Sequence, residues 1–368
     1  MYSDVLQPIL HRPKLPALCS SLMRLAKKIG PGEKFPPMME LTKGLGVAMA
    51  TLDQGFSRLE SQGVVERRQG SGIYVSRSIA RRRIGMVFGS NVFSAGVSPF
   101  YQMLLGRCES RSALLEERFS FYIDMEARHR SSGEIPAHAD LVEALLNHKL
   151  DGLLLAARAS EEQETWLRRQ GIPVVSFAVR DTGPWCVTVH YEELIRLGVQ
   201  SLRDAGCHTI GLLGILAEHG PVFLKALGDS GLPVDPAWVL CPKNGDHPPA
   251  DTHDQLGRDY ALQLFTQDKA RRKANKSGMP DGILITDDLL ARGACTVLEA
   301  AGRSIGKDIK VATHATKGAR VLSPWERDLA RIVVDPEQIV DAMFALLEAQ
   351  LEHRELEHNC VLISPQLA

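Results

Sequence analysis

From residue 84 onward, short apolar runs alternate with segments of helical periodicity, and this alternation is what most limits the possible fold. The runs are apolar nearly throughout, as expected of strands that are buried on both faces of a parallel sheet. The predicted strands are 84–88, 119–123, 152–155, 173–177, 209–213, 282–285 and 310–312, with helical periodicity between them over 139–148, 191–205 and 289–301. Alternating strands and helices predict an α/β architecture that binds ligands at the carboxyl ends of its strands.

The beginning of the chain has another pattern. Leucines at helical spacing predict a helix from 15 to about 29, and two more helices follow at 38–44 and 48–62. Two β-rich runs, 64–67 and 73–75, are joined by a basic, glycine-containing turn, which predicts a hairpin. Three helices and a hairpin make a winged helix-turn-helix, in which one helix enters the major groove and the hairpin reaches neighbouring phosphates. Leu52, Phe56 and Leu59 are assigned to packing alone.

The charge of the two parts differs in sign. The 368 residues have a formal net charge of −1, but the first 83 carry 14 Lys or Arg against 6 Asp or Glu, and the rest carry 29 against 38. A basic segment joined to a larger acidic one indicates that only the basic part meets a polyanion. We therefore divide the chain into a winged helix-turn-helix over 1–76, a basic linker over 77–83 and an α/β domain over 84–368.

Residues 31–75 resemble the DNA-binding domain of the GntR family. The resemblance rests on Pro31-Gly32, Phe35-Pro36, Glu40-Leu41, Leu45-Gly46-Val47, Thr51-Leu52, Leu59, Gly63 and the wing ERRQGSGIYV. The family's Ser before the second helix and Ser-Arg at the start of the third are replaced here by Pro37, Ala48 and Met49. The resemblance therefore leaves DNA contact to Thr51, Gln54, Ser57, Arg58, Arg67, Arg68, Gln69 and Ser71, and it implies an unusual operator. Each of these side chains could also be exposed without binding anything.

Residues 84–368 resemble the effector domain of the LacI/GalR repressors, which have the two-lobed fold of type I periplasmic binding proteins. The segments that carry the resemblance include IGMVFGSNVFSAGVSPFYQMLLGRCE, LLNHKLDGLLLAA, IPVVSFAV, LIRLGVQSLRDAGCHTIGLLG and PDGILITDDLLARGACTVLEAAG, in family order. The resemblance implies a first lobe of about 84–178 and 332–354 and a second of about 179–331 and 355–368. A small molecule would bind in the cleft between them.

By resemblance, the effector-binding residues are Phe100, Tyr101, Phe177, Arg180, His219, Asp287 and His314. Arg180 stands after a strand, where its guanidinium can grip a carboxylate or a pair of hydroxyls. Other roles remain open: Phe100 and Phe177 as core aromatics, the two histidines as exposed loop residues, and Asp287 as the N-cap of the next helix. Sugar-binding relatives carry Arg and Asp where this chain has His219 and Ala315, which counts against a simple sugar as the effector.

Other classes of function lack the motifs that they need. GxSxG, HExxH, P-loop and GxGxxG motifs do not stand where their chemistry would require them, so neither an enzyme nor a bound cofactor is expected. Asp246, His247, Asp251, His253 and Asp254 could ligate a metal, but their irregular spacing in a Pro-rich stretch favours a solvated loop and no metal site.

The sequence also indicates where such a chain works. Its seven cysteines are scattered without a CxxC pair, which suits a reducing cytoplasm. No apolar run approaches the roughly 18 residues of a membrane span, and the start lacks the apolar stretch of a signal peptide. We therefore expect a cytoplasmic protein without a membrane partner.

Together these features predict a transcriptional regulator, more specifically a repressor. It would bind double-stranded operator DNA as a homodimer and respond to a small polar molecule, such as a sugar derivative or an acid. Ligand binding would move the lobes and thereby change the spacing of the two wings. The competing hypothesis is a solute-binding module with weak or lost DNA contact, because Pro37, Ala48 and Met49 replace residues that the family uses on DNA.

Overall fold

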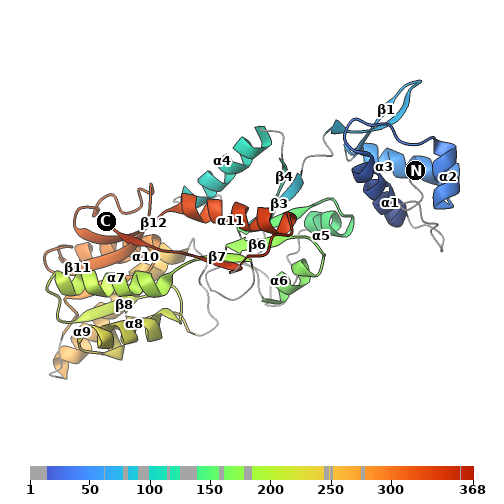
Figure 1. The fold of residues 1–368 in the computed structure, drawn as a ribbon. Helices are drawn as coiled ribbons and strands as arrows, with labels where there is room; N and C mark the ends of the chain where they lie inside the picture. The colour runs from blue at the N-terminus through green and yellow to red at the C-terminus, as the bar shows by residue number, and fades with distance from the viewer. Residues whose placement is uncertain are drawn as a thin grey trace.

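The computed structural model describes residues 15–61, 63–77, 82–89, 99–113, 117–124, 139–156, 161–177, 185–243, 248, 252–274, 278–356 and 358–368. Figure 1 shows three parts: a small N-terminal unit of helices and a hairpin, and two α/β lobes, the first of which lies between that unit and the second lobe. Among the helices of these residues, none combines the length and apolar character needed to cross a membrane.

The N-terminal unit, here called the reader, is a winged helix-turn-helix, as the sequence predicts. It consists of α1 (Leu15–Ile29), α2 (Met38–Leu45), α3 (Met49–Ser61) and an antiparallel hairpin of β1 (Val65–Arg68) and β2 (Gly72–Val75). Leu52, Phe56 and Leu59 of α3 are buried against the leucines of α1, as expected. Phe35 packs edge-on against Phe56, with ring centroids 5.1 Å apart. This apolar core fixes α3 under the hairpin.

The first lobe is built on a six-stranded parallel sheet in the order β4-β3-β5-β6-β7-β13. Its strands are β3 (Arg82–Gly89), β4 (Glu117–Asp124), β5 (Gly152–Ala156), β6 (Val174–Phe177), β7 (Cys186–Val189) and β13 (Cys360–Ile363). Its helices are α4 (Pro99–Ala113), α5 (Ala139–Leu146), α6 (Glu161–Arg168) and α11 (Pro336–Leu351). The central strand β5 is buried along its whole length, as the apolar sequence predicts.

The second lobe repeats the plan with the order β9-β8-β10-β11-β12-β14. Its strands are β8 (Ile210–Leu213), β9 (Val239–Leu240), β10 (Gly282–Ile285), β11 (Lys310–Thr316), β12 (Leu329–Val334) and β14 (Gln366–Leu367), of which only β14 is antiparallel to its neighbour. Its helices are α7 (Tyr191–Asp204), α8 (His219–Asp229), α9 (His253–Lys273) and α10 (Asp288–Ala300), with a 3₁₀ turn at Pro236–Trp238. The α/β fold class is therefore confirmed for both lobes.

Helices α9 and α10 pack backbone to backbone, and two glycines make this possible. A Cβ on Gly257 would lie 2.0 Å from the carbonyl oxygen of Leu290, and one on Gly293 would lie 1.9 Å from that of Asp254. Any side chain at either position would force the helices apart. The contact matters because it brings the beginning of α9 next to the beginning of α10.

The lobe boundaries implied by the resemblance are wrong in detail. The chain crosses between the lobes at 189–191, 334–336 and 363–366 rather than near 178, 332 and 354, because β7 and β13 complete the first sheet and β12 belongs to the second. β7 is buried at all four residues, so it cannot be a surface crossing, and β12 pairs with β11 over six residues. The first sheet also begins inside the expected linker, because β3 starts at Arg82. The next residue, Arg83, donates hydrogen bonds from its guanidinium to Asp151 at 3.0 Å.

Candidate functional site

The predicted DNA-binding residues lie on α3 and on the hairpin. On α3, Gln54 and Ser57 are exposed, whereas Thr51 and Arg58 are half-buried. On the hairpin, the exposed predicted residues are Arg67, Arg68, Gln69 and Ser71. Met49, which stands where the family has Arg, is also exposed. The structure thus places the predicted residues on the helix and wing that a winged reader presents to DNA.

Arg67 turns away from the outer side of the wing and onto α3. Its guanidinium donates to Asp53 Oδ1 at 2.8 Å and to Ser57 Oγ at 2.9 Å, and its Nε lies 3.1 Å from Glu60 Oε2. Two carboxylates therefore balance its charge before any phosphate approaches. In this arrangement Arg67 connects the hairpin to the recognition helix, and the phosphate contact expected from the sequence stays a prediction.

Arg68 keeps its charge on the surface of the wing. Its guanidinium lies over the Tyr74 ring, 4.1 Å from the centroid, and the Tyr74 hydroxyl is 2.7 Å from Ser71 Oγ. Its one ion pair is long, at 3.5 Å from Glu66 Oε2, and both side chains are about half exposed. Exposed pairs of this kind contribute little energy. Arg68 is therefore held in place by stacking while it remains available to a phosphate.

Arg58 connects the reader to the first lobe. Its Nη2 donates to Asn147 Oδ1 at 3.0 Å, across the boundary between α3 and the turn that follows α5. The side chain that the sequence assigns to DNA thus also contacts the effector domain.

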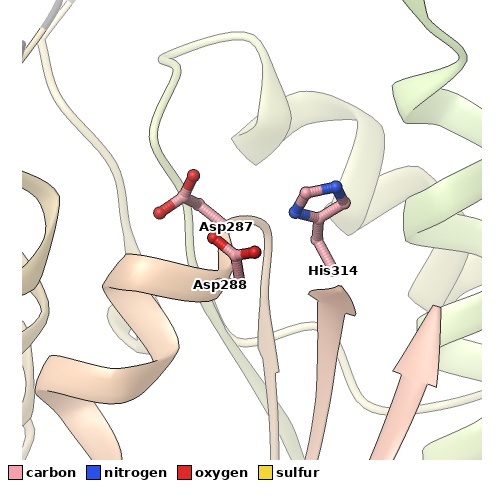
Figure 2. Close-up of side chains that lie close together, drawn as sticks. All are labelled: Asp287, Asp288 and His314. Carbon is pink, nitrogen blue, oxygen red and sulfur yellow. The ribbon is translucent and has the colours of Figure 1, made fainter. Parts of the chain in front are cut away.

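Three of the predicted effector residues meet at the carboxyl edge of the second sheet. Leu213, Ile285 and Thr313 are register partners on β8, β10 and β11, so the residues that follow them emerge side by side. Asp287 and Asp288 open α10, His314 lies on β11 and His219 opens α8. Figure 2 shows the carboxylates of Asp287 and Asp288 beside the imidazole of His314. With His253 at the start of α9, these residues form what we call the His–Asp cluster: His219, His253, Asp287, Asp288 and His314.

Asp287 is both a helix cap and half of an ion pair. Its Oδ1 accepts a hydrogen bond from Leu290 N at 2.9 Å, which confirms the N-cap role left open by the sequence, and the same oxygen lies 3.1 Å from His253 Nδ1. Burial would raise the pKa of Asp287, but His253 and the Leu290 amide outweigh it and hold that pKa below its usual range. Burial would likewise lower the pKa of His253, but Asp287 raises it overall. Each group of the pair therefore favours the charged form of the other.

Asp288 has the opposite tendency. Its Oδ2 accepts from Thr316 N at 3.3 Å, but burial, followed by the negative charge of Asp287, raises the pKa of Asp288. Two adjacent buried carboxyls cannot both ionise cheaply, and His253 pairs with Asp287 rather than with Asp288. The two carboxyls of the cluster therefore differ in the direction of their pKa shifts.

Two imidazoles of the cluster present unused nitrogens. His219 is only 2% exposed, and its Nδ1 is 2.9 Å from Thr286 Oγ1. The Tyr191 ring packs against it at a tilt of 37°, with ring centroids 4.7 Å apart. Among the described residues, the buried imidazole nitrogens of the cluster without a hydrogen bond are His219 Nε2, His253 Nδ1 and His314 Nδ1, of which His253 Nδ1 has an ion-pair contact with Asp287. Burial lowers the pKa of His219 to about 3, so this ring is neutral. The expectation that these histidines could be exposed loop residues is wrong for His219.

The cluster could also hold a cation. Asp287, Asp288 and His314 each offer one ligand atom, and these atoms lie within 4.8 Å of one another. Carboxylate oxygens and imidazole nitrogens are ligands of several divalent metals. The same atoms bind hydroxyl groups equally well, so the sequence-based expectation of no metal stays a prediction.

The first lobe contributes aromatic side chains. Phe100 is buried in the core and packs against Phe177, with ring centroids 4.7 Å apart, and against Tyr101 at 5.1 Å. Phe100 is therefore a core residue, the alternative that the sequence left open, whereas Phe177 and Tyr101 are half-buried. Arg180, the residue expected to grip the ligand, lies outside the described residues.

A recess of about 340 Å³ lies between the lobes, one helical turn beyond Asp288. Pro99 and Gln102 of α4 line it from the first lobe, and Arg292 with residues 318–321 lines it from the second. Arg292 is engaged with Asp254 at 2.7 Å. The recess lies between the two lobes, and the residues of the cluster are not among those that line it.

Sequence reasoning missed part of the cluster. It placed His253 in a solvated loop, but the side chain is buried at the start of α9 and pairs with Asp287. Thr286 and Tyr191 were not predicted as site residues either, whereas Asp288 was expected beside Asp287 by resemblance. The doublet Asp287-Asp288 after an apolar strand was an available signal, whereas nothing local indicates that His253 lies near it.

Two family models match the chain. Residues 23–75 match the bacterial regulatory proteins of the gntR family, and residues 199–368 match the periplasmic binding protein-like domain. The HTH-type transcriptional regulator GalR of Streptococcus thermophilus is 22% identical over 322 residues, which cover 85% of this chain and 92% of that protein.

Solved structures with the same fold are also regulators. A LacI-family regulatory protein from Chloroflexus aggregans matches with a TM-score of 0.58 and 20% identity, over 77% of this chain and 96% of that one. The transcriptional regulator CelR in complex with cellobiose matches with a TM-score of 0.59 and 18% identity, over 97% of this chain and 98% of that one. These relatives are regulators rather than enzymes, as the sequence predicts. The chain is thus a DNA-binding transcriptional regulator in which a GntR-type winged helix-turn-helix precedes a periplasmic-binding-protein-like domain of the LacI type.

Proposed function

We propose that the chain is a repressor whose effector binds between the lobes, against the His–Asp cluster. The observation that carries this proposal is the pair of buried, unused nitrogens, His219 Nε2 and His314 Nδ1. A buried polar group without a partner costs about 1–3 kcal/mol. A ligand that supplies the missing hydrogen bonds removes this cost, so the cluster favours the ligand-bound state.

The chemistry of the cluster suits a ligand rich in hydroxyl groups. The neutral imidazole of His219 and the carboxyl groups of Asp287 and Asp288 together offer both donors and acceptors. A hydroxyl group is also both donor and acceptor. The CelR structure is a complex with cellobiose, which supports a sugar or sugar derivative as the ligand here. The replaced Arg and Asp positions mean that such a ligand would be held by other groups than in sugar-binding relatives.

On the DNA side, we propose that a cytoplasmic homodimer binds a palindromic operator. A single winged unit covers one half-site, and a symmetric dimer covers two. Arg68, Gln69 and Ser71 of the wing would contact the backbone, while Gln54 and Thr51 of α3 would face the bases. Met49 offers no hydrogen bond where the family has Arg, so operator preference should depart from that of the family.

The Arg58–Asn147 contact provides a direct route from the first lobe to the recognition helix. A ligand that moves the first lobe would shift α3 through this contact. Allosteric coupling in proteins amounts to about 1–3 kcal/mol, which changes operator affinity about 5- to 150-fold.

The test is fluorescence anisotropy of the full chain on labelled DNA from upstream of its own gene, with a panel of monosaccharides, disaccharides and sugar acids. The variants are D288N and H314A in the cluster, with R180A for the residue outside the described part. H208A is the matched control, because His208 is an exposed histidine at the opposite edge of the same sheet.

One or more sugars should change the DNA affinity of the wild type and of H208A by about 5- to 150-fold. D288N and H314A should lose this response while they keep the ligand-free affinity. If both cluster variants responded like the wild type, the cluster would not be the effector site. A sugar that binds without any change in DNA affinity would favour the competing hypothesis of a solute-binding module.

A further inference from the structure

Two cysteines face each other on the strands from which the chain leaves the first lobe. Cys186 begins β7, Cys360 begins β13, and the two residues are register partners in a parallel pair. The Cys186 thiol donates toward Cys360 Sγ, with the sulfur atoms 2.6 Å apart. Neighbouring strands lie about 4.8 Å apart, and the Cα atoms of a disulfide are about 4.4–6.8 Å apart. The backbone therefore already has a spacing that a disulfide can bridge.

The surroundings give the pair access to an oxidant. β13 is an edge strand of the first sheet, and Cys360 is half-buried on it, whereas Cys186 is 1% exposed on the inner strand β7. A small oxidant can thus reach Cys360 from the open edge, and Cys186 lies directly behind it. Burial raises the pKa of the thiols of Cys108, Cys241 and Cys295 to about 12, which makes them poor nucleophiles.

We propose that Cys186 and Cys360 are a modification site at which a hydroperoxide forms a reversible intrachain disulfide. The Cys360 thiolate attacks one peroxide oxygen, breaks the O–O bond and becomes a sulfenic acid, while the other oxygen leaves and is protonated to water or an alcohol. The Cys186 sulfur then attacks the sulfenic sulfur and displaces its oxygen as a second water. The two thiols lose two electrons and two protons in total, and the peroxide gains them.

The disulfide would tie together two of the segments that connect the lobes. Three residues after each cysteine, at Val189 and Ile363, the strands end and the chain crosses to the second lobe. His190 N donates to Ile363 O at 3.0 Å, so the two crossings leave side by side. A covalent link just before them prevents β13 from separating from β7. Oxidation would thereby restrict movement between the lobes, whatever the effector is.

The experiment treats the reduced full chain with hydrogen peroxide, then alkylates it and measures intact mass and peptide masses. The wild type should lose two hydrogen atoms, retain five of its seven cysteines for alkylation and yield a peptide pair linked through Cys186 and Cys360. Dithiothreitol should restore all seven. C19S is the matched control, because it removes a half-buried thiol of the reader and should leave the link intact. C360S and C360A should both abolish it.

Several outcomes would overturn the proposal: seven alkylated cysteines after peroxide, a link to another cysteine, dimers linked through Cys360, or sulfinic acid at Cys360 without a link. The clamping role has its own readout. A cross-link between residues 174 positions apart restricts the unfolded chain, so the oxidised wild type should melt at a higher temperature than the reduced protein. C360S should melt at one temperature with or without peroxide. An unchanged melting temperature for the oxidised wild type would contradict the clamp.

Discussion

The reader and the His–Asp cluster use polar side chains in opposite ways. On the reader, Arg67 and Arg68 are exposed and bonded to neighbours on α3 and within the hairpin. In the cluster, side chains from α8, α9, α10 and β11 are brought together in the protein interior, and two imidazole nitrogens stay unused. Exposed ion pairs contribute about 0–1 kcal/mol, whereas an unsatisfied buried group costs about 1–3 kcal/mol.

The difference indicates how each site responds to its ligand. The surface pairs of the reader can exchange an internal partner for a phosphate at little cost, which suits reversible binding of many DNA sequences. The cluster cannot rearrange in this way, because its side chains are fixed by backbone packing. We therefore expect an effector bound at this proposed site to act on the lobe as a whole.

The largest effect should come from breaking the packing that builds the cluster. G293A places a Cβ 1.9 Å from the Asp254 carbonyl oxygen, so α9 and α10 must separate and His253 must leave Asp287. We expect the free energy of unfolding to fall by about 3 kcal/mol, at the upper end for overpacked sites, with loss of the ligand response. Urea unfolding followed by circular dichroism measures this.

G106A is the matched control, because Gly106 is also helical and a Cβ there meets nothing within 4 Å. It should be neutral or stabilise the protein by up to about 1 kcal/mol, since alanine is the better helix former. Equal stability of G293A and G106A would show that the cluster does not depend on the contact between α9 and α10.

The next largest effect should be a loss of stability when the pH is lowered. The pKa of His219 is about 3 in the folded protein against an ordinary value of 6.5. Between these two pH values the imidazole is protonated in the unfolded chain and neutral in the folded one. Stability should therefore fall as the pH drops from 6.5 toward 3, by at most about 1.4 kcal/mol per pH unit. H219Q, which cannot be protonated, should remove this part of the slope.

The comparison of wild type and H219Q isolates His219 from its neighbours. The raised pKa of His253 gives stability that is complete below pH 6.5 and is lost as the pH rises through the folded value, so it adds no slope in acid. The lowered pKa of Asp287 matters only below its ordinary value of 3.8. Unfolding free energies from pH 6.5 to 4.5 measure the difference, and parallel curves would refute the assignment.

The two regions also differ in how far the sequence could predict them. The reader is a contiguous segment, and its helices and hairpin were predicted to within one or two residues, because apolar spacing and glycines set their bounds. The strands β5 and β10 were equally clear, since they are buried along their length. The short strands β9 and β14 were not predicted, because two residues are too few to show a periodic pattern.

The site residues also differed in how far the sequence could predict them. Asp287 and His219 could be predicted because they stand beside strands that were recognised. His253 could not, because its place in the cluster depends on the contact between Gly257 and α10, and α10 begins more than 30 residues later in the chain. The contacts of Arg67 could not be predicted for a related reason: its charge indicates phosphate binding, and only the fold shows Asp53, Ser57 and Glu60 around it.

A smaller effect should separate the two wing arginines. R68A removes an available charge, so it should weaken binding to all DNA sequences alike and reduce the salt dependence by about one unit. R67A removes a fastener between hairpin and α3, so it should lower stability by about 1 kcal/mol and leave the salt dependence nearly unchanged. Anisotropy titrations at several salt concentrations measure both slopes. A reduced salt dependence of DNA binding in R67A would indicate that Arg67 contacts the phosphate backbone.

The smallest effect should appear where the reader contacts the first lobe. N147A removes the hydrogen bond that Arg58 donates to the first lobe, without altering the reader itself. One such bond contributes about 0.5–1.5 kcal/mol, so the ligand-induced change in DNA affinity should shrink by less than about tenfold while the affinity for the ligand stays the same. K149A is the matched control, because Lys149 lies in the same turn and pairs with Glu143 of α5 instead. Anisotropy with and without the effector measures the response. Equal responses of N147A, K149A and the wild type would mean that the movement reaches α3 by another path.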